Sequence, residues 1–139
     1  MTSQPRVPMM AIERDECLEL LASRRVGRVA VNLDDAAQPV VRPVHFAFDP
    51  VSQSIVFRSV PGTKLYALTH STHAAFEVDA VDPDQHTGWS VVVHGVSEAV
   101  RDPVEIRRLE RLADDDWFAE SGAQWIRIRA RTVTGRRLR

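Results

Sequence analysis

The sequence has one cysteine, one lysine and no long apolar run, and each shortage excludes a class of protein. Because Cys17 has no second thiol to pair with, no intrachain disulfide can form, and we expect a cytoplasmic location. No segment approaches the roughly 20 apolar residues that span a bilayer, so we expect no membrane partner. A net charge of −1 argues against a nucleic-acid partner.

The chain of 139 residues is long enough for one domain with its own hydrophobic core. We expect a flexible N-terminal arm over residues 1–10 and a single domain over residues 11–139. Cys17 lies in an apolar helical stretch and reads as a buried structural thiol. His70 and His73 lack a third ligand at a recognisable spacing, so we expect no metal site.

The apolar residues change from helical to alternating spacing near Gly27. Helical spacing over Glu13–Arg25 predicts an amphipathic helix, whereas Val29, Val31 and Leu33 alternate with other residues as in a half-buried strand. Turn residues separate the later strand patterns, which predicts an antiparallel meander for the first three strands. The later strands are expected at 39–48, 54–59, 74–81, 88–100 and 125–133, with a short helix at 63–70. Six mostly antiparallel strands predict a mainly β fold that closes into a barrel with short helices.

A second helix is expected from Asp102 to about Leu112. Asp102 can cap its first turn, a proline follows directly, and Glu105 can complete a capping box. On the last expected strand Arg127, Arg129 and Arg131 alternate. We expect these arginines to face water or a partner subunit.

The segment Arg58–Lys64 is the best candidate for a binding site, because it joins a strand end, a Pro-Gly turn and a helix start. A helix N-terminus has unpaired N–H groups and a partial positive charge, which suit an anion. Thr63 adds a hydroxyl, while Arg58 and Lys64 add a planar guanidinium and a compact ammonium group. This pattern fits a monophosphate site, although an ordinary turn with solvated cations fits the spacing too.

Two further segments carry side chains of interest. In Thr87–Ser90, Gly88 permits close backbone approach, Trp89 offers a stacking surface and Ser90 offers a hydroxyl. In the segment 41–45, Arg42 can reach a phosphate or a carboxylate, and His45 can act on a ligand or face solvent. Taken alone, Trp89 is more readily explained as a core or interface aromatic, and His45 as a structural residue.

The order of these segments resembles that of the pyridoxamine 5′-phosphate oxidase-like family, the FMN-binding split β-barrels. The resemblance covers about Glu13 to Leu138 and depends on the succession of several short motifs. These motifs are Val26–Val31, Pro39–Phe46, Ile55–Ser59, Gly62–Lys64, Phe76–Asp79, Gly88–Gly95 and Trp125–Ile128.

The resemblance implies a six-stranded antiparallel split barrel that forms a homodimer, with FMN in a cleft between the subunits and a small-molecule substrate. It implies that Arg58, Ser59, Thr63 and Lys64 hold the phosphate and the ribityl chain. Along the isoalloxazine ring it places Arg42, Pro43 and Val44, and it places Trp89 and Ser90 at the flavin's flank. Trp125 would come from the partner subunit.

The chain departs from true pyridoxamine-phosphate oxidases, since it is short and ends on Thr134–Leu138 without the usual C-terminal motif. The leading hypothesis is therefore an FMN-dependent oxidoreductase of unknown substrate, with no catalytic acid or base assigned. If protons must move, His45 and His94 are the candidates. The alternatives are an F420-dependent reductase, with a basic groove at Arg127–Arg131, and a non-catalytic flavin or haem carrier or redox sensor.

Overall fold

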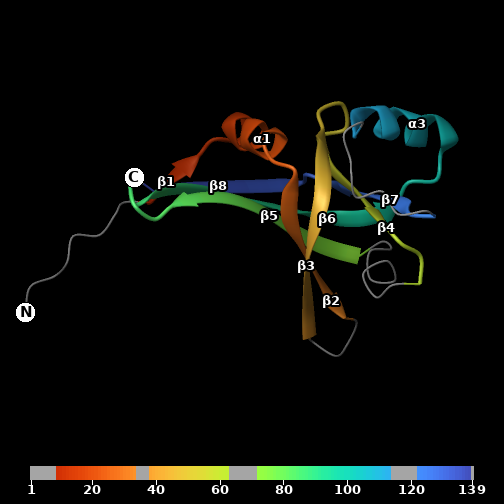
Figure 1. Ribbon diagram of the computed structural model, residues 1–139, viewed down its shortest axis with the longest axis horizontal. Coiled ribbons are helices and arrows are strands. Elements are labelled where there is room, and N and C mark those ends of the chain that lie inside the picture. Colours follow the sequence, from red (N-terminus) through yellow and green to blue (C-terminus); the bar gives the residue numbers. More distant parts are fainter. Residues whose placement is uncertain (1–8, 34–37, 63–71, 114–121, 139) are drawn as a thin grey trace, which may run out of the picture.

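The computed structural model describes residues 9–33, 38–62, 72–113 and 122–138 (Figure 1). Its elements are β1 (Met9–Ile12), α1 (Arg14–Ala22), β2 (Val26–Leu33), β3 (Gln38–Asp49), β4 (Ser54–Ser59), β5 (Thr72–Asp82), β6 (Thr87–Ala99), α3 (Pro103–Leu112), β7 (Gln124–Arg129) and β8 (Thr132–Leu138). The helix expected at 63–70 lies outside the described residues. No helix among the described residues is both long and apolar enough to cross a membrane.

The strands form one antiparallel sheet in the order β1-β8-β6-β5-β2-β3-β4-β7. An additional pairing between β6 and β7 closes the six strands from β6 to β7 in this order into a barrel, which β8 and β1 extend at one side. This confirms the predicted mainly β fold with a six-stranded antiparallel barrel. Pairing of β2 with β3 and of β3 with β4 confirms the predicted meander.

The C-terminal strand prediction was wrong in one respect. The strand expected over 125–133 ends at Arg129, and after a short break the chain continues as β8, which pairs with β6 and β1. Met9 and Met10, which we had assigned to the flexible arm, form half of β1. These segments lack a clear alternating apolar pattern, and their pairing with distant strands makes them strands.

The barrel interior contains the main hydrophobic core, and α1 closes one end of it. Phe46 and Phe76 meet edge to face in this core, with ring centroids 4.7 Å apart. From α1, Cys17 and Leu21 enter the same core, and both are fully buried. Burial raises the pKa of the Cys17 thiol, with Glu16 adding to the shift, which confirms the prediction of a buried thiol.

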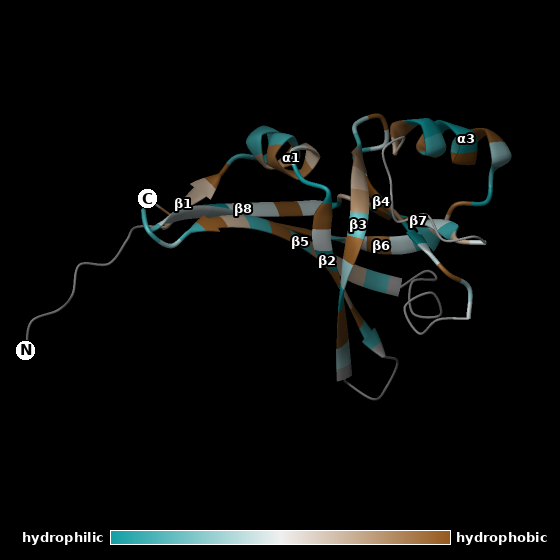
Figure 2. Cartoon of the chain, viewed as in Figure 1, coloured by the Kyte–Doolittle hydropathy of each residue, from teal (hydrophilic) through white to brown (hydrophobic). Residues whose placement is uncertain are grey.

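The outer face of β3, β4 and β7 carries a second core beneath α3. Its buried residues are Ala47, Val56, Val100, Leu109 and Trp125. Figure 2 shows brown and teal residues on different sides of α3, as an amphipathic helix requires. Asp102 caps α3 as predicted, because its carboxylate accepts a hydrogen bond from the Val104 N–H at 3.2 Å.

Contact between α1 and β8 depends on Gly135. A Cβ atom added there would lie 2.5 Å from the Cys17 Sγ and 3.0 Å from the Ile12 Cβ. We predict that Gly135→Val lowers the free energy of unfolding by about 1–3 kcal/mol, the usual cost of overpacking. Chemical denaturation measures this loss. Thr134→Val, at the exposed neighbouring position, serves as the control and is expected to have little effect. Equal losses in both variants would contradict this account of the contact.

Candidate functional site

The ladder between β3 and β4 is short, and the barrel splits where it ends. It runs from the pair Asp49↔Ser54 to the pair Phe46↔Phe57. Before Phe46, β3 pairs with β2 instead, whereas β4 pairs with β7 along its whole length, from Ser54 to Ser59. Arg58 and Ser59 therefore follow directly after the last rung that β4 shares with β3.

Arg58 stacks on Trp125 at this split. The two residues are register partners on β4 and β7, and the Arg58 guanidinium carbon lies 4.9 Å from the centroid of the Trp125 ring. Trp125 is only 4% exposed and packs under α3 against Leu109. A side chain buried in its own chain is unavailable to a partner subunit, so the expected contribution of Trp125 to a neighbouring copy does not fit its position.

A cavity of about 320 Å³ lies beside this pair, between the strands and α3. Arg58 and Trp125 line it from the strands, Ile106 and Glu110 from α3, and Arg101 from the segment before α3. The Nε1 atom of Trp125 is buried and has no hydrogen-bond acceptor among the described residues. Two guanidinium groups and a buried unsatisfied donor make this cavity suitable for an anionic or oxygen-rich group.

The remaining residues of the expected phosphate site are only partly described. Ser59 is nearly buried and pairs with Gln124. The turn that follows contains Gly62 at a φ of 88°, a left-handed conformation that favours glycine. Thr63 and Lys64 lie outside the described residues, so their part in the site stays a prediction.

Arg42, Pro43 and Val44 lie on β3 just before the split and pair with β2. Arg42 and Pro43 are exposed, and Val44 is half-buried at the edge of the main core. The Arg42 Nη1 donates to the carbonyl oxygen of its neighbour Val41 at 2.9 Å. Arg42 thus stands at the surface near the split.

Trp89 and Ser90 lie in a different place, at the start of β6 beside the end of β8. Trp89 packs at the edge of the main core, with the Arg24 guanidinium carbon 5.4 Å from the centroid of its ring. A second cavity, of about 430 Å³, is lined by Trp89 together with Ala80, Arg137 and Leu138. Gly88 does permit a close backbone approach, but to β5: a Cβ there would lie 2.8 Å from the Ala80 carbonyl oxygen.

The two groups of expected cofactor residues lie at opposite ends of β6. Trp89 and Ser90 are at its start, whereas Ala99, at its end, pairs with Ile126 beside Trp125. Ser90 and Ala99 are nine positions apart, and a strand rises about 3.3 Å per residue, so roughly 30 Å of strand lies between them. Within one chain, the structure does not bring Trp89 and Ser90 together with Arg58 and Trp125.

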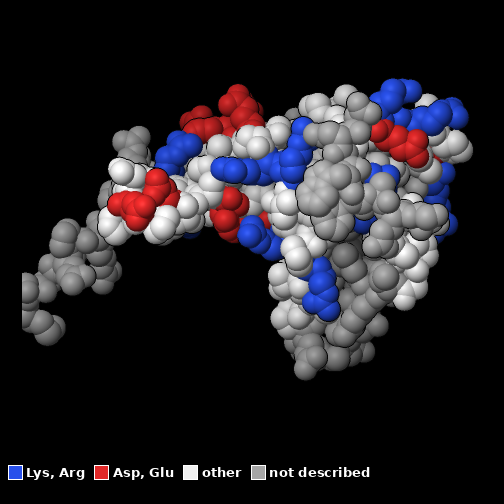
Figure 3. Space-filling view, in the orientation of Figure 1, with Lys and Arg blue, Asp and Glu red and all other residues white. Residues whose placement is uncertain are grey.

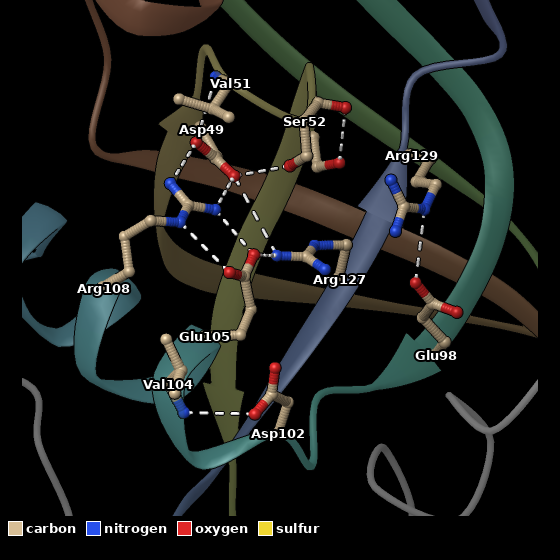
Figure 4. A network of polar contacts seen from close by, with 11 residues as sticks. Asp49, Val51, Ser52, Glu98, Asp102, Val104, Glu105, Arg108, Arg127 and Arg129 are labelled. Atoms are coloured by element: carbon tan, nitrogen blue, oxygen red, sulfur yellow. Dashed lines mark hydrogen bonds and ion pairs between the residues drawn. The ribbon is translucent and has the colours of Figure 1, made fainter.

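A charged network that we did not predict holds α3 onto the barrel (Figure 4). The fully buried Asp49, at the end of β3, accepts two hydrogen bonds from Arg108 of α3, at 2.6 and 2.9 Å. Glu105 accepts hydrogen bonds from Arg108 and Arg127. Two carboxylates and two guanidinium groups thus balance each other under the helix.

This network corrects two predictions. The cap of α3 comes from Asp102 alone. Glu105 pairs with Arg108 and Arg127 and does not complete the expected capping box. Arg127 is 6% exposed and faces neither water nor a partner, whereas Arg129 and Arg131 are exposed. The basic groove expected at Arg127–Arg131 therefore lacks its first member. No sequence signal marks the network, since Asp49 looks like a turn residue before a proline.

Hydrogen bonding controls the charge state of the network. Burial by itself would raise the pKa of Asp49, but hydrogen bonds from Arg108, Ser52 and the Val51 N–H outweigh it and hold that pKa far below its usual range. Hydrogen bonds from Arg108 and Arg127 lower the pKa of Glu105 to about 2. Both carboxylates are thus ionised at neutral pH.

The two histidines named as candidates for proton transfer lie apart in the described part of the chain. His45 is half-buried on β3, and His94 is exposed on β6. Both side chains point to the outer side of the barrel. Among the described residues, no three His, Cys, Asp or Glu side chains are close enough to hold a metal ion.

Comparison with known proteins identifies the family. The family model described as pyridoxamine 5′-phosphate oxidase matches residues 13–137. This chain belongs to that family. Among family relatives, an uncharacterised protein of Mycobacterium tuberculosis is 33% identical over 135 residues, which cover 94% of this chain and 86% of that protein.

Solved structures support the same assignment. The FAD-binding protein of Mycobacterium smegmatis is 31% identical, has a TM-score of 0.82, and is matched over 94% of this chain and 98% of its own. The FAD-binding protein of Mesorhizobium loti is 26% identical, has a TM-score of 0.75, and is matched over 96% and 99%. The fold is therefore that of flavin-binding members of the family.

Asp49 offers a test of how α3 is held. Its folded pKa is depressed, so its stabilisation is present above roughly pH 4 and lost as the pH falls further. We predict that Asp49→Asn lowers the free energy of unfolding by about 3 kcal/mol at neutral pH, because Arg108 and Arg127 are then left with one carboxylate, Glu105, between them. The variant should also lose less stability than the wild type on acidification below pH 4.

Urea denaturation at several pH values measures both effects. Asp84→Asn is the matched control, because Asp84 is an exposed aspartate in the turn between β5 and β6. A variant as stable as the wild type would show that the network does not hold α3.

Proposed function

We propose that this protein is a flavin-dependent oxidoreductase that binds FMN between two copies of the chain, with Arg58 as the main phosphate ligand. One observation carries the proposal: Arg58 stacks on a buried tryptophan one residue beyond the last pair that β4 shares with β3. The stacked guanidinium keeps its orientation while its edge can hydrogen-bond a phosphate. The family's flavin-binding neighbours support the same cofactor class.

The residues present fit a flavin phosphate. Arg101 adds a second guanidinium beside the cavity, the Trp125 N–H has no acceptor within the described part of the chain, and the glycine turn at Gly62 leads directly to Thr63 and Lys64. We propose that Ser59, Thr63 and Lys64 complete the phosphate and ribityl contacts. Arg42, Pro43 and Val44 would lie along the isoalloxazine ring. A bound flavin supplies hydride transfer at N5, and the protein supplies position and charge.

The distance along β6 supports a homodimer. Because roughly 30 Å of strand separates Ser90 from the Arg58 end, one FMN cannot contact both groups in one chain. We propose a two-fold dimer in which the start of β6 in one copy lies against the Arg58 end of the other copy. Because each copy carries both groups of residues, such a dimer has two equivalent sites. Trp89 and Ser90 would then flank a flavin held by Arg58 of the second copy.

FAD is the second candidate cofactor. The neighbours from Mycobacterium smegmatis and Mesorhizobium loti are both named for FAD binding. The cavity of about 320 Å³ beside Arg58 offers space, and Arg101 offers charge, for a second phosphate. F420 is less well supported, because Arg127 of the expected groove is neutralised by Glu105. Titration calorimetry with FMN, FAD and F420 ranks the three, and clear preference for F420 would refute a flavin cofactor.

Arg58→Ala tests the phosphate ligand. We predict at least a tenfold loss of FMN affinity, since a charge-assisted hydrogen bond contributes about 1.5–3 kcal/mol. Fluorescence titration of FMN measures the affinity. Arg131→Ala, an exposed arginine between β7 and β8, is the control and should bind FMN like the wild type. Unchanged affinity in Arg58→Ala would show that the phosphate lies elsewhere.

Mixing two variants that each bind FMN weakly tests whether one site is built from two subunits. Arg58→Ala and Trp89→Ala chains should each bind FMN weakly, because every dimer of one kind has two defective sites. Refolding them together should restore tight binding at a fraction of sites, because each mixed dimer has one site with both native halves. No recovery in verified mixed dimers would argue that each site belongs to one chain.

Reduction kinetics test the reaction class. Stopped-flow mixing of the flavin-loaded protein with NAD(P)H, with and without quinone or nitro acceptors, should show flavin bleaching and reoxidation. A protein that binds flavin but turns over no acceptor would instead be a carrier or redox sensor.

A further inference from the structure

The cavity beside Trp89 lies where the β5–β6 hairpin meets the end of β8. Its volume of about 430 Å³ is within the range of roughly 300–1,000 Å³ that is usual for small-molecule sites. Most of its wall consists of two adjacent rows of register partners on β5, β6 and β8. They are Ala80, Trp89 and Arg137 in one row and Val81, Gly88 and Leu138 in the next. The wall is thus mainly apolar, with one aromatic ring and one guanidinium group.

Trp89 gives this cavity a flat aromatic surface. Its side chain points to the same side of β6 as the buried Val91, whereas Ser90 points to the opposite side. The Arg24 guanidinium carbon lies 5.4 Å from the centroid of the Trp89 ring, and Arg24 is not among the residues that line the cavity. The cation therefore holds the ring from outside the cavity, and the ring offers a stacking surface to a planar molecule inside it.

Arg137 gives the cavity a cation whose position is fixed. Its Nη1 donates to the Oε1 and Oε2 atoms of Glu16 on α1, at 2.7 and 3.4 Å. Both hydrogen bonds come from the same nitrogen, so the guanidinium keeps further N–H groups for a ligand. The edge of a guanidinium matches a carboxylate, which can accept two parallel hydrogen bonds from it.

The charges near Arg137 fit a ligand with a single negative charge. Glu16 already offsets part of the guanidinium charge. Asp82 also lines the cavity, but its Oδ1 accepts hydrogen bonds from two N–H groups of the hairpin turn. Figure 3 shows acidic and basic atoms side by side at the end of the molecule where β1 and β8 lie, without a strongly basic patch. A carboxylate suits this balance better than a phosphate dianion, which would need more cationic partners.

We propose that this cavity binds a planar aromatic carboxylate, with its ring against Trp89 and its carboxylate on Arg137. The apolar side chains of Ala80, Val81 and Leu138 would keep water from the ring. This site goes beyond the proposed flavin site. A flavin held against Ser90 lies on the other side of β6, so the two ligands do not compete.

Titration calorimetry of the full chain with 2-naphthoate as the probe tests the site. Two related probes each lack one feature: 2-naphthalenemethanol has the flat rings without the carboxylate, and cyclohexanecarboxylate has the carboxylate without a flat ring. We expect each to bind at least about tenfold more weakly than 2-naphthoate, because stacking and the charge-assisted hydrogen bonds are both needed.

Arg137→Gln should weaken 2-naphthoate binding about tenfold, because the charged hydrogen bonds are lost. Glu16→Gln removes the same ion pair but leaves the guanidinium, so it should bind at least as well as the wild type. Arg136→Gln changes the exposed neighbour on the opposite side of β8 and should bind like the wild type. Circular dichroism of each variant confirms that it is folded.

The outcomes separate this inference from the proposed function. Wild-type protein that binds no 2-naphthoate at millimolar concentration would overturn the inference, and so would equal losses in Arg137→Gln and Glu16→Gln. Probe affinity that falls as the protein concentration rises would overturn it too, because a second copy would then cover the cavity. Full competition between FMN and 2-naphthoate would place the flavin in this cavity and overturn only the inference. A protein that binds 2-naphthoate but no flavin would overturn only the proposed function.

Discussion

Strand β6 forms hydrogen-bonded ladders with three strands, and the barrel closes because it changes partner along one edge. It pairs with β5 along nearly its whole length, with β8 as far as His94, and with β7 from Ser97 onward. The change of partner requires the corner between β7 and β8 to cross β6 closely. At Gly95 a Cβ would lie 2.0 Å from the Arg129 carbonyl oxygen, so a side chain there would force the corner away. Arg131 then donates its N–H to the His94 carbonyl.

This strand also separates the two halves of the proposed site. Its start carries Trp89 and Ser90, and its end borders the β7 strand that carries Trp125. A long strand that closes the barrel necessarily holds its two ends apart. The split between β3 and β4 follows from the same closure, because β3 first pairs with β2 and only its last four residues reach β4. The proposed flavin site and the proposed dimer are therefore consequences of one topology.

Two charged clusters differ in balance, and the difference indicates different roles. Under α3, Asp49 and Glu105 meet Arg108 and Arg127, so the buried charges compensate one another and fix the helix. On the outer side of β2 and β5, Glu77 and Asp79 share Arg28, and all three side chains are partly exposed to solvent. The balanced network therefore holds a helix in place, whereas the second cluster is a surface feature.

The sequence by itself determined the six barrel strands, the meander, the cap at Asp102 and the burial of Cys17, because alternation, turn residues and capping are local properties. The order of its motifs also indicated the family. Only the tertiary structure decided that Thr132–Leu138 is a strand and that Arg127 is buried against Glu105, since both depend on partners far away in the chain. It alone separated Trp89 from Arg58 as well, because their distance is set by the path of β6 around the barrel and not by local sequence.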